Sequence, residues 1–80
     1  MKLYGSHLCP DTLYALNVLV SKGVDFSFYN ISADLAHLKA FLKLRESCPL
    51  YDAVRARDGI GIPCFVKDDG EVTLNLDDVL

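Results

Sequence analysis

The segment SHLCPDTLYAL places one cysteine, Cys9, directly before a proline at the start of a helical pattern. If Cys9 is the N-cap of that helix and Pro10 its first residue, the missing N–H of proline costs nothing, because this N–H has no partner within a helix. The N–H groups of Asp11 and Thr12 then point back at the sulfur and, with the helix dipole, favour the thiolate. The pattern predicts a nucleophilic cysteine.

Three neighbours are expected to modify the reactivity of this thiol. The hydroxyl of Thr12 can donate to the sulfur of Cys9, whereas the carboxylate of Asp11 disfavours a second negative charge beside it. His7 can tune the thiol, although a solvent-facing loop histidine is the more frequent case. We therefore expect moderate activation, with an inert buried cysteine before a helix as the alternative.

Two further cysteines, Cys48 and Cys64, bring the number of thiols to 3. An odd number at irregular spacing predicts neither a disulfide framework nor a metal site. Period two places Cys64 on the same face as Val66 and opposite Phe65. We interpret Cys64 as a core thiol, with a resolving partner for Cys9 as the alternative, and Cys48 as peripheral.

Other polar side chains receive structural interpretations. The arginines 45, 55 and 57 are expected to form a solvated face, with a grip on a substrate carboxylate as the alternative. The 4 tyrosines, Tyr51 among them, are interpreted as residues at the edge of the core.

The elements that must position these residues alternate along the chain. Residues 2–6 follow period two and predict a strand, and a helix of about 13 residues is expected after Cys9, ending at Lys22-Gly23. A second strand is expected over residues 24–29, followed by a helix that Ser32 caps and that ends near Cys48-Pro49. The inward side chains expected are Leu13, Leu16, Leu19 and Val20 in the first helix and Leu35, Leu38, Phe41 or Leu42, and Arg45 in the second.

The last third of the chain predicts a short helical piece, a hairpin and one final helical turn. The helical piece is expected over residues 50–57, and the hairpin strands over 64–66 and 71–74 flank an Asp-Gly turn. The order strand, helix, strand, helix, hairpin predicts an α/β domain over residues 1–80, with a parallel first pair of strands in a mixed sheet.

Composition excludes several classes of function. The net charge is −3 with only 8 dispersed Lys and Arg, which argues against nucleic-acid binding. No apolar run approaches the roughly 18 residues of a membrane span, and the first residues lack the apolar core of a signal peptide. We expect a cytoplasmic monomer without a membrane partner.

Cys9-Pro10-Asp11-Thr12 after the first strand, and Ile62-Pro63 in the segment GIGIP, resemble the glutaredoxin family, and the resemblance covers nearly the whole chain. It is closest to short bacterial glutaredoxin-related proteins with a C-P-D-T motif. It implies a thioredoxin-like fold, with a four-stranded sheet flanked by helices, the order β-α-β-α-β-β and a truncated C-terminal helix. It also implies a cis bond before Pro63, and contacts of Pro10, Ile62 and Pro63 with glutathione or a substrate peptide.

The chain departs from the family pattern at several positions. Thr12 replaces the second cysteine of dithiol glutaredoxins, so the resemblance implies a monothiol route through Cys9. Leu74-Asn75 replace the glycine pair that receives the γ-glutamyl end of glutathione, whereas the acidic pair Asp77-Asp78 is retained and expected to bind substrate. Ser6 stands where a lysine is usual, and the missing C-G-F-S motif argues against iron–sulfur transfer.

Two functions follow as hypotheses. The first is a thiol–disulfide oxidoreductase that reduces protein or glutathione mixed disulfides in cell redox homeostasis, with glutathione as reductant and no bound cofactor. The second is a catalytically silent thioredoxin-like module that binds proteins. The first requires Cys9 to react faster than a free thiol, and the second does not.

Overall fold

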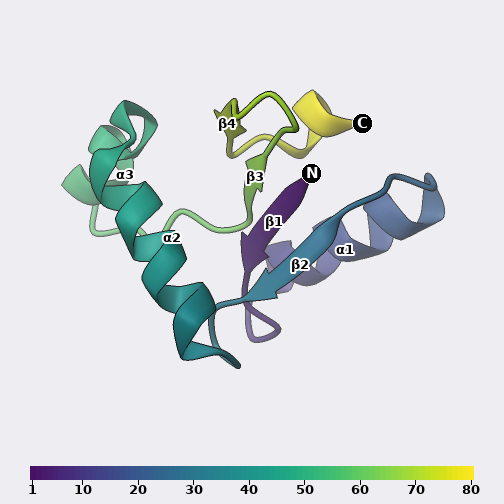
Figure 1. Ribbon diagram of the computed structural model, residues 1–80, viewed down its shortest axis with the longest axis horizontal. Helices are drawn as coiled ribbons and strands as arrows, with labels where there is room; N and C mark the ends of the chain where they lie inside the picture. The colour runs from purple at the N-terminus through teal and green to yellow at the C-terminus, as the bar shows by residue number, and fades with distance from the viewer.

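The computed structural model describes residues 1–80 as a four-stranded mixed sheet with helices on both faces (Figure 1). The strands lie in the order β2-β1-β3-β4. The central strand β1 pairs in parallel with β2 and antiparallel with β3, which in turn pairs antiparallel with β4. Their bounds are β1 Lys2–Gly5, β2 Ser27–Asn30, β3 Cys64–Val66 and β4 Val72–Thr73. The expected α/β class and mixed sheet are confirmed.

Helices occupy the predicted places between the strands. Helix α1 (Pro10–Ser21) connects the parallel pair, and α2 (Leu35–Ser47) follows β2. A short 3-10 turn η1 (Pro49–Tyr51) and helix α3 (Asp52–Ala56) precede the segment GIGIP, and a single turn η2 (Leu76–Val79) ends the fold. None of these helices has the length and hydrophobicity that crossing a membrane requires.

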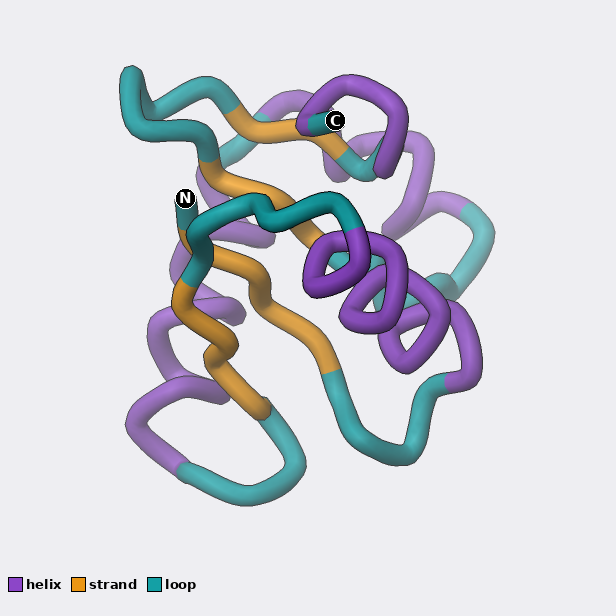
Figure 2. Tube along the Cα trace, turned by 90° about the vertical axis from the view of Figure 1, so that its right-hand side faces the viewer, coloured by secondary structure: helices purple, strands orange, loops and turns teal.

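Successive side chains of a strand point to opposite faces of the sheet, so the hydrophobic core is divided between the two faces. Figure 2 shows α1 and α2 on opposite sides of the strands. On one face, Leu3 and its partner Phe65 pack with buried residues of α1. On the other, Tyr4 and its partner Cys64 pack with Phe41 of α2 and with residues of η1 and α3. The prediction that Cys64 and Phe65 face opposite sides is confirmed.

The buried face of α1 differs from the predicted one. Leu13 and Val20 are 45% and 69% exposed, whereas Thr12 and Ala15 are buried. The helix presents small side chains to β1 because it approaches Gly5 so closely that a Cβ there would lie 2.5 Å from Thr12 Cγ2. The expected inward role of Leu13 and Val20 is therefore wrong.

The N-cap of helix α2 lies two residues later in the sequence than the expected cap, Ser32. Asp34 is the N-cap, and its carboxylate accepts a hydrogen bond from the Ala36 N–H at 2.8 Å. Ser32 lies in the preceding turn, where its hydroxyl bonds Ser6 instead. Phe41 is buried, whereas Leu35 and Leu42 are exposed, so the inward stripe of this helix is narrower than predicted.

The second strand is also shorter than predicted, because Val24, its expected first residue, makes a hydrogen bond to the preceding helix. The N–H of Val24 donates to Leu19 O and so extends the end of α1. Sheet pairing starts only at Ser27, whose N–H donates to Met1 O at 2.9 Å.

Candidate functional site

Cys9 lies at the junction of β1 and α1, as predicted. It is the N-cap of the helix with an extended backbone (φ −98°, ψ 118°), and Pro10 follows as a first-turn residue. The carbonyl of Cys9 accepts the N–H of Leu13 at 3.1 Å, and its own N–H donates to Ser6 O at 3.0 Å. The side chain is half-buried and its thiol is free.

Thr12 has a different role from the expected one. The Cys9 side chain accepts no capping hydrogen bond from the N–H groups of the first turn. Thr12 is fully buried and its Oγ1 accepts the N–H of Ser6 at 3.4 Å, while its methyl group packs against Gly5. The hydroxyl therefore joins the first turn of the helix to the residue after β1 and makes no hydrogen bond to the sulfur.

His7 also binds elsewhere. Its Nδ1 lies 2.9 Å from the Asn30 side-chain amide, which makes the imidazole nitrogen the acceptor. The neighbouring Ser6 hydroxyl bonds Ser32 at 2.5 Å and accepts the N–H of Leu8 at 3.1 Å. Side chains from the last residue of β2 and from the turn after it thus bind the loop that precedes Cys9, and the expected tuning contact of His7 with the thiol is not formed.

Cys9 opens on a cavity of about 500 Å³. Most of its lining surface is apolar, and its rim includes Leu8 and Ile60, which are 73% and 60% exposed. The lining residues are Ser6, Leu8, Cys9, Ile31, Ser32, Ile60, Gly61 and Ile62. The thiol of Cys9 is therefore accessible from the cavity and bordered by apolar surface.

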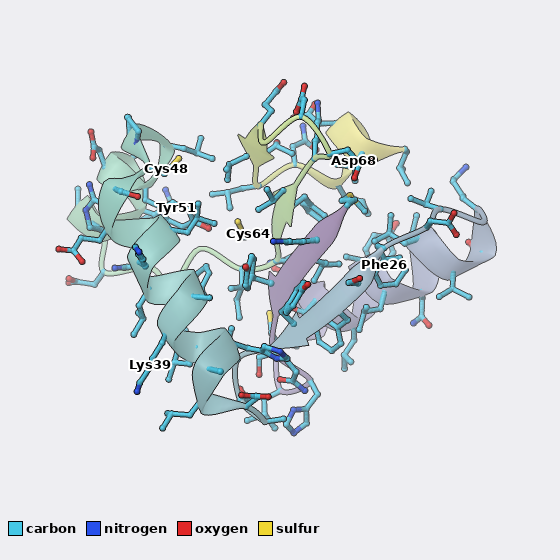
Figure 3. All side chains as sticks on the ribbon, viewed as in Figure 1. Phe26, Lys39, Cys48, Tyr51, Cys64 and Asp68 are labelled. Atoms are coloured by element: carbon cyan, nitrogen blue, oxygen red, sulfur yellow. The ribbon has the colours of Figure 1, made fainter.

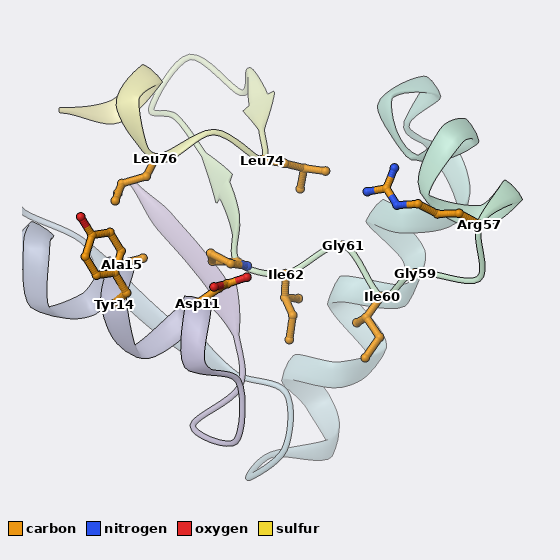
Figure 4. A pocket seen from close by; sticks show the side chains of 11 residues that line it. Asp11, Tyr14, Ala15, Arg57, Gly59, Ile60, Gly61, Ile62, Leu74 and Leu76 are labelled. Carbon is orange, nitrogen blue, oxygen red and sulfur yellow. The ribbon is translucent and has the colours of Figure 1, made fainter.

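A second cavity, of about 470 Å³, shares residues 60–62 with the first (Figure 4). Helix α1 contributes Asp11, Tyr14 and Ala15, and Leu74 and Leu76 line it from the C-terminal segment. Arg57 lies on the far side of this cavity from Tyr14 (Figure 4), so it is the arginine available to a ligand here. The segment 60–62 therefore separates two hollows beside the N-terminus of α1.

The peptide bond between Ile62 and Pro63 is cis, as the resemblance implies. Ile62 lines both cavities and Pro63 lines the second, whereas Pro10 is exposed and lines neither. Neither the N–H nor the carbonyl of Ile62 makes a hydrogen bond within the chain. A backbone donor and acceptor are thus free at the wall of the Cys9 cavity.

The acidic pair near the C-terminus is not brought to this site. Asp78 accepts a hydrogen bond from Thr73 Oγ1 at 2.6 Å and lines a different hollow, beside Met1. The N–H of Asp77 donates to the Asn75 side chain, which caps η2. These bonds fold the single turn η2 back onto the end of β4, and the substrate contacts expected of Asp77 and Asp78 stay a prediction.

Cys64 is a core thiol. It is fully buried, and burial raises the pKa of this thiol, an effect that the neighbouring Tyr51 hydroxyl partly opposes. Figure 3 shows Cys64 at the start of β3, with Tyr51 and Cys48 on the α2 side. Cys48 is half-buried and packs against the same core. The raised pKa disfavours Cys64 as a resolving thiolate for Cys9, and no cluster of three potential metal ligands is present.

The structure adds two residues that the sequence analysis did not assign to the site. Arg45 donates to the carbonyls of Gly59 (2.5 Å) and Ile60 (3.1 Å), and Tyr51 donates to that of Gly61 (2.7 Å). The expectation that Arg45 lies on a solvated face is therefore wrong. A signal was present in the sequence, because the predicted inward stripe of the second helix contained this arginine, and an inward arginine needs partners.

A protein of Haemophilus influenzae described as "Uncharacterized protein" is 35% identical to this chain over 74 residues, which cover 92% of this chain and 86% of the relative. The chain belongs to the same family as this protein. No family model matches the sequence, and no solved structure matches it.

Proposed function

We propose that this chain is a glutaredoxin-like thiol–disulfide oxidoreductase with a thioredoxin-like fold, and that Cys9 is its nucleophile. The observation that carries the proposal is the placement of Cys9 at the N-terminus of α1, on a cavity bordered by the free backbone of Ile62. The four-stranded mixed sheet with helices on both faces supports the fold, since the resemblance implies such a sheet.

The proposed reaction proceeds by two thiol–disulfide exchanges. The Cys9 thiolate attacks the glutathione sulfur of a mixed disulfide, which forms a Cys9–glutathione disulfide and releases the substrate thiolate. A second glutathione thiolate then attacks the glutathione sulfur of that adduct, which forms glutathione disulfide and restores the Cys9 thiolate. Each cycle consumes one free glutathione, which leaves as glutathione disulfide together with the glutathionyl group of the substrate, so no bound cofactor is required.

The lining of the two cavities suits the protein part of a mixed disulfide. Leu74 lines the second cavity where the resembling family has a glycine for the γ-glutamyl end of glutathione. The lining of the Cys9 cavity is largely apolar, which suits apolar side chains beside a cysteine of a polypeptide. We therefore propose protein–glutathione mixed disulfides as substrates, in a reducing compartment such as the cytoplasm.

One observation favours the second candidate, a silent protein-binding module. The Cys9 side chain accepts no capping hydrogen bond, so the stabilisation of its thiolate rests on the helix dipole alone. The same apolar cavities would then hold a protein segment without exchange.

The experiment that separates the two is the pH dependence of Cys9 alkylation by iodoacetamide. Cys9→Ser gives the blank, and a variant with Cys48→Ser and Cys64→Ser reports Cys9 alone. The oxidoreductase requires alkylation that persists to lower pH than for a free thiol, and a glutathione adduct at Cys9 in the mass spectrum after incubation with glutathione disulfide. Alkylation like that of a free cysteine, with no adduct, would reject it in favour of the binding module.

A further inference from the structure

The segment that borders the Cys9 cavity has an unusual distribution of backbone hydrogen bonds. The carbonyls of three successive residues, Gly59, Ile60 and Gly61, each accept a hydrogen bond from a side chain. The N–H groups of Ile60, Gly61 and Ile62, in contrast, have no partner within the chain. The acceptors of this segment are therefore occupied, while its donors stay available to a ligand.

Two side chains supply all three of these bonds, and both come from the opposite side of the segment from α1. Arg45 of α2 uses Nη2 for Gly59 O and Nε for Ile60 O, so one guanidinium fixes two neighbouring peptide groups. Tyr51 of η1 supplies the third bond, to Gly61 O. We name Arg45 and Tyr51 the carbonyl clamp.

The clamp is itself held in place. Tyr51 is fully buried, and its ring meets that of Phe41 edge to face, with centroids 6.0 Å apart. Arg55 of α3 donates to the carbonyl of Arg45 at 2.5 Å and pairs with Asp52. Because the donors are anchored in the core and in two helices, the segment they bind has a defined position.

That position matters for the site because residues 60–62 line both cavities, including the one on which Cys9 opens. No other hydrogen bond within the chain holds Ile60, Gly61 or Ile62. Releasing the clamp would leave the free donors and the side chains of Ile60 and Ile62 in several orientations, and a bound disulfide would lose alignment with the thiolate.

We propose that Arg45 and Tyr51 are positioning residues for disulfide exchange at Cys9. They act through Gly59–Gly61 and touch neither the sulfur nor the substrate. This inference rests on the proposed function, because it assigns the clamp to the same exchange reaction.

The test compares Tyr51→Phe, which removes only the hydroxyl, and Arg45→Lys, which keeps the charge but loses the two-point contact. Tyr29→Phe is the matched control, since Tyr29 packs against the same core and its hydroxyl makes no hydrogen bond within the chain. Two rates are measured: exchange with a cysteine peptide carrying a glutathione disulfide, and alkylation of Cys9 by iodoacetamide. Circular dichroism establishes that each variant is folded.

For each clamp variant we expect kcat/KM of exchange to fall about tenfold, mainly through kcat, while Cys9 alkylation stays within about twofold of wild type. Tyr29→Phe should leave both rates unchanged. Folded clamp variants that exchange like wild type would overturn the inference. A parallel fall in exchange and alkylation would also overturn it, because the clamp would then act on the nucleophile or on the fold as a whole. If the wild type itself forms no adduct and exchanges no peptide, the proposed function is rejected first, and the positioning role with it.

Discussion

The Tyr51 hydroxyl donates to the carbonyl of Gly61 at 2.7 Å, and its ring lies so close that a Cβ on Gly61 would stand 2.2 Å from Tyr51 Cε1. Gly61 also has φ +85°, in the region that favours glycine. One buried side chain thus fixes a carbonyl of the segment beside the proposed nucleophile and forbids a side chain at the same residue.

Gly61→Ala should therefore destabilise the protein far more than an ordinary glycine substitution. The positive φ alone costs about 1–3 kcal/mol, and the overlap with the Tyr51 ring adds to it. Gly70→Ala is the matched control, because Gly70 has φ +91° with nothing within 4 Å of the added Cβ. Urea unfolding measures both free energies, and equal losses would show that the Tyr51 contact contributes nothing.

Thr12→Val should lower stability without changing the reactivity of Cys9. Valine keeps the packing against Gly5 but removes the acceptor for the buried Ser6 N–H, at a cost of about 1–3 kcal/mol. The hydroxyl makes no bond to the sulfur, so alkylation of Cys9 should proceed at the wild-type rate. Thr12→Ser retains the acceptor and serves as control. Slower alkylation in Thr12→Val, with no loss of stability, would assign the hydroxyl to the thiol instead.

The stability of the fold should decrease in alkaline solution. Burial raises the pKa of the Cys64 thiol, and burial together with Cys64 raises the pKa of Tyr51. Above the unfolded thiol pKa of about 8.5, the unfolded chain has lost the Cys64 proton while the native chain retains it. The unfolded state then binds fewer protons, so the free energy of unfolding falls as pH rises toward the native pKa.

Urea unfolding of wild type and Cys64→Ala at several pH values between about 7 and 10 measures this effect. The variant loses packing at every pH, so the comparison concerns the slope against pH, which should be shallower in Cys64→Ala. Cys48→Ala controls for the loss of a half-buried thiol. Identical slopes for wild type and Cys64→Ala would contradict the assignment to Cys64.

Local patterns determined much of this fold from the sequence. Cys9 and Pro10 mark the start of α1 because capping preferences act within one turn of backbone. Period two separated Cys64 from Phe65, since neighbouring strand residues point to opposite faces whatever covers them. The Asp-Gly turn formed as predicted, with the Lys67 N–H donating to Glu71 O.

Tertiary structure decided how these elements meet at the site. Thr12 faces Gly5 rather than the sulfur, because the distance between α1 and β1 determines which face of the helix is buried. Asp78 accepts a hydrogen bond from Thr73, because the last turn folds back on β4. Arg45 and Tyr51 reach the carbonyls of residues 59–61 because α2 and η1 pack on the sheet beside that segment. Such contacts join residues far apart in the sequence, and no local preference encodes them.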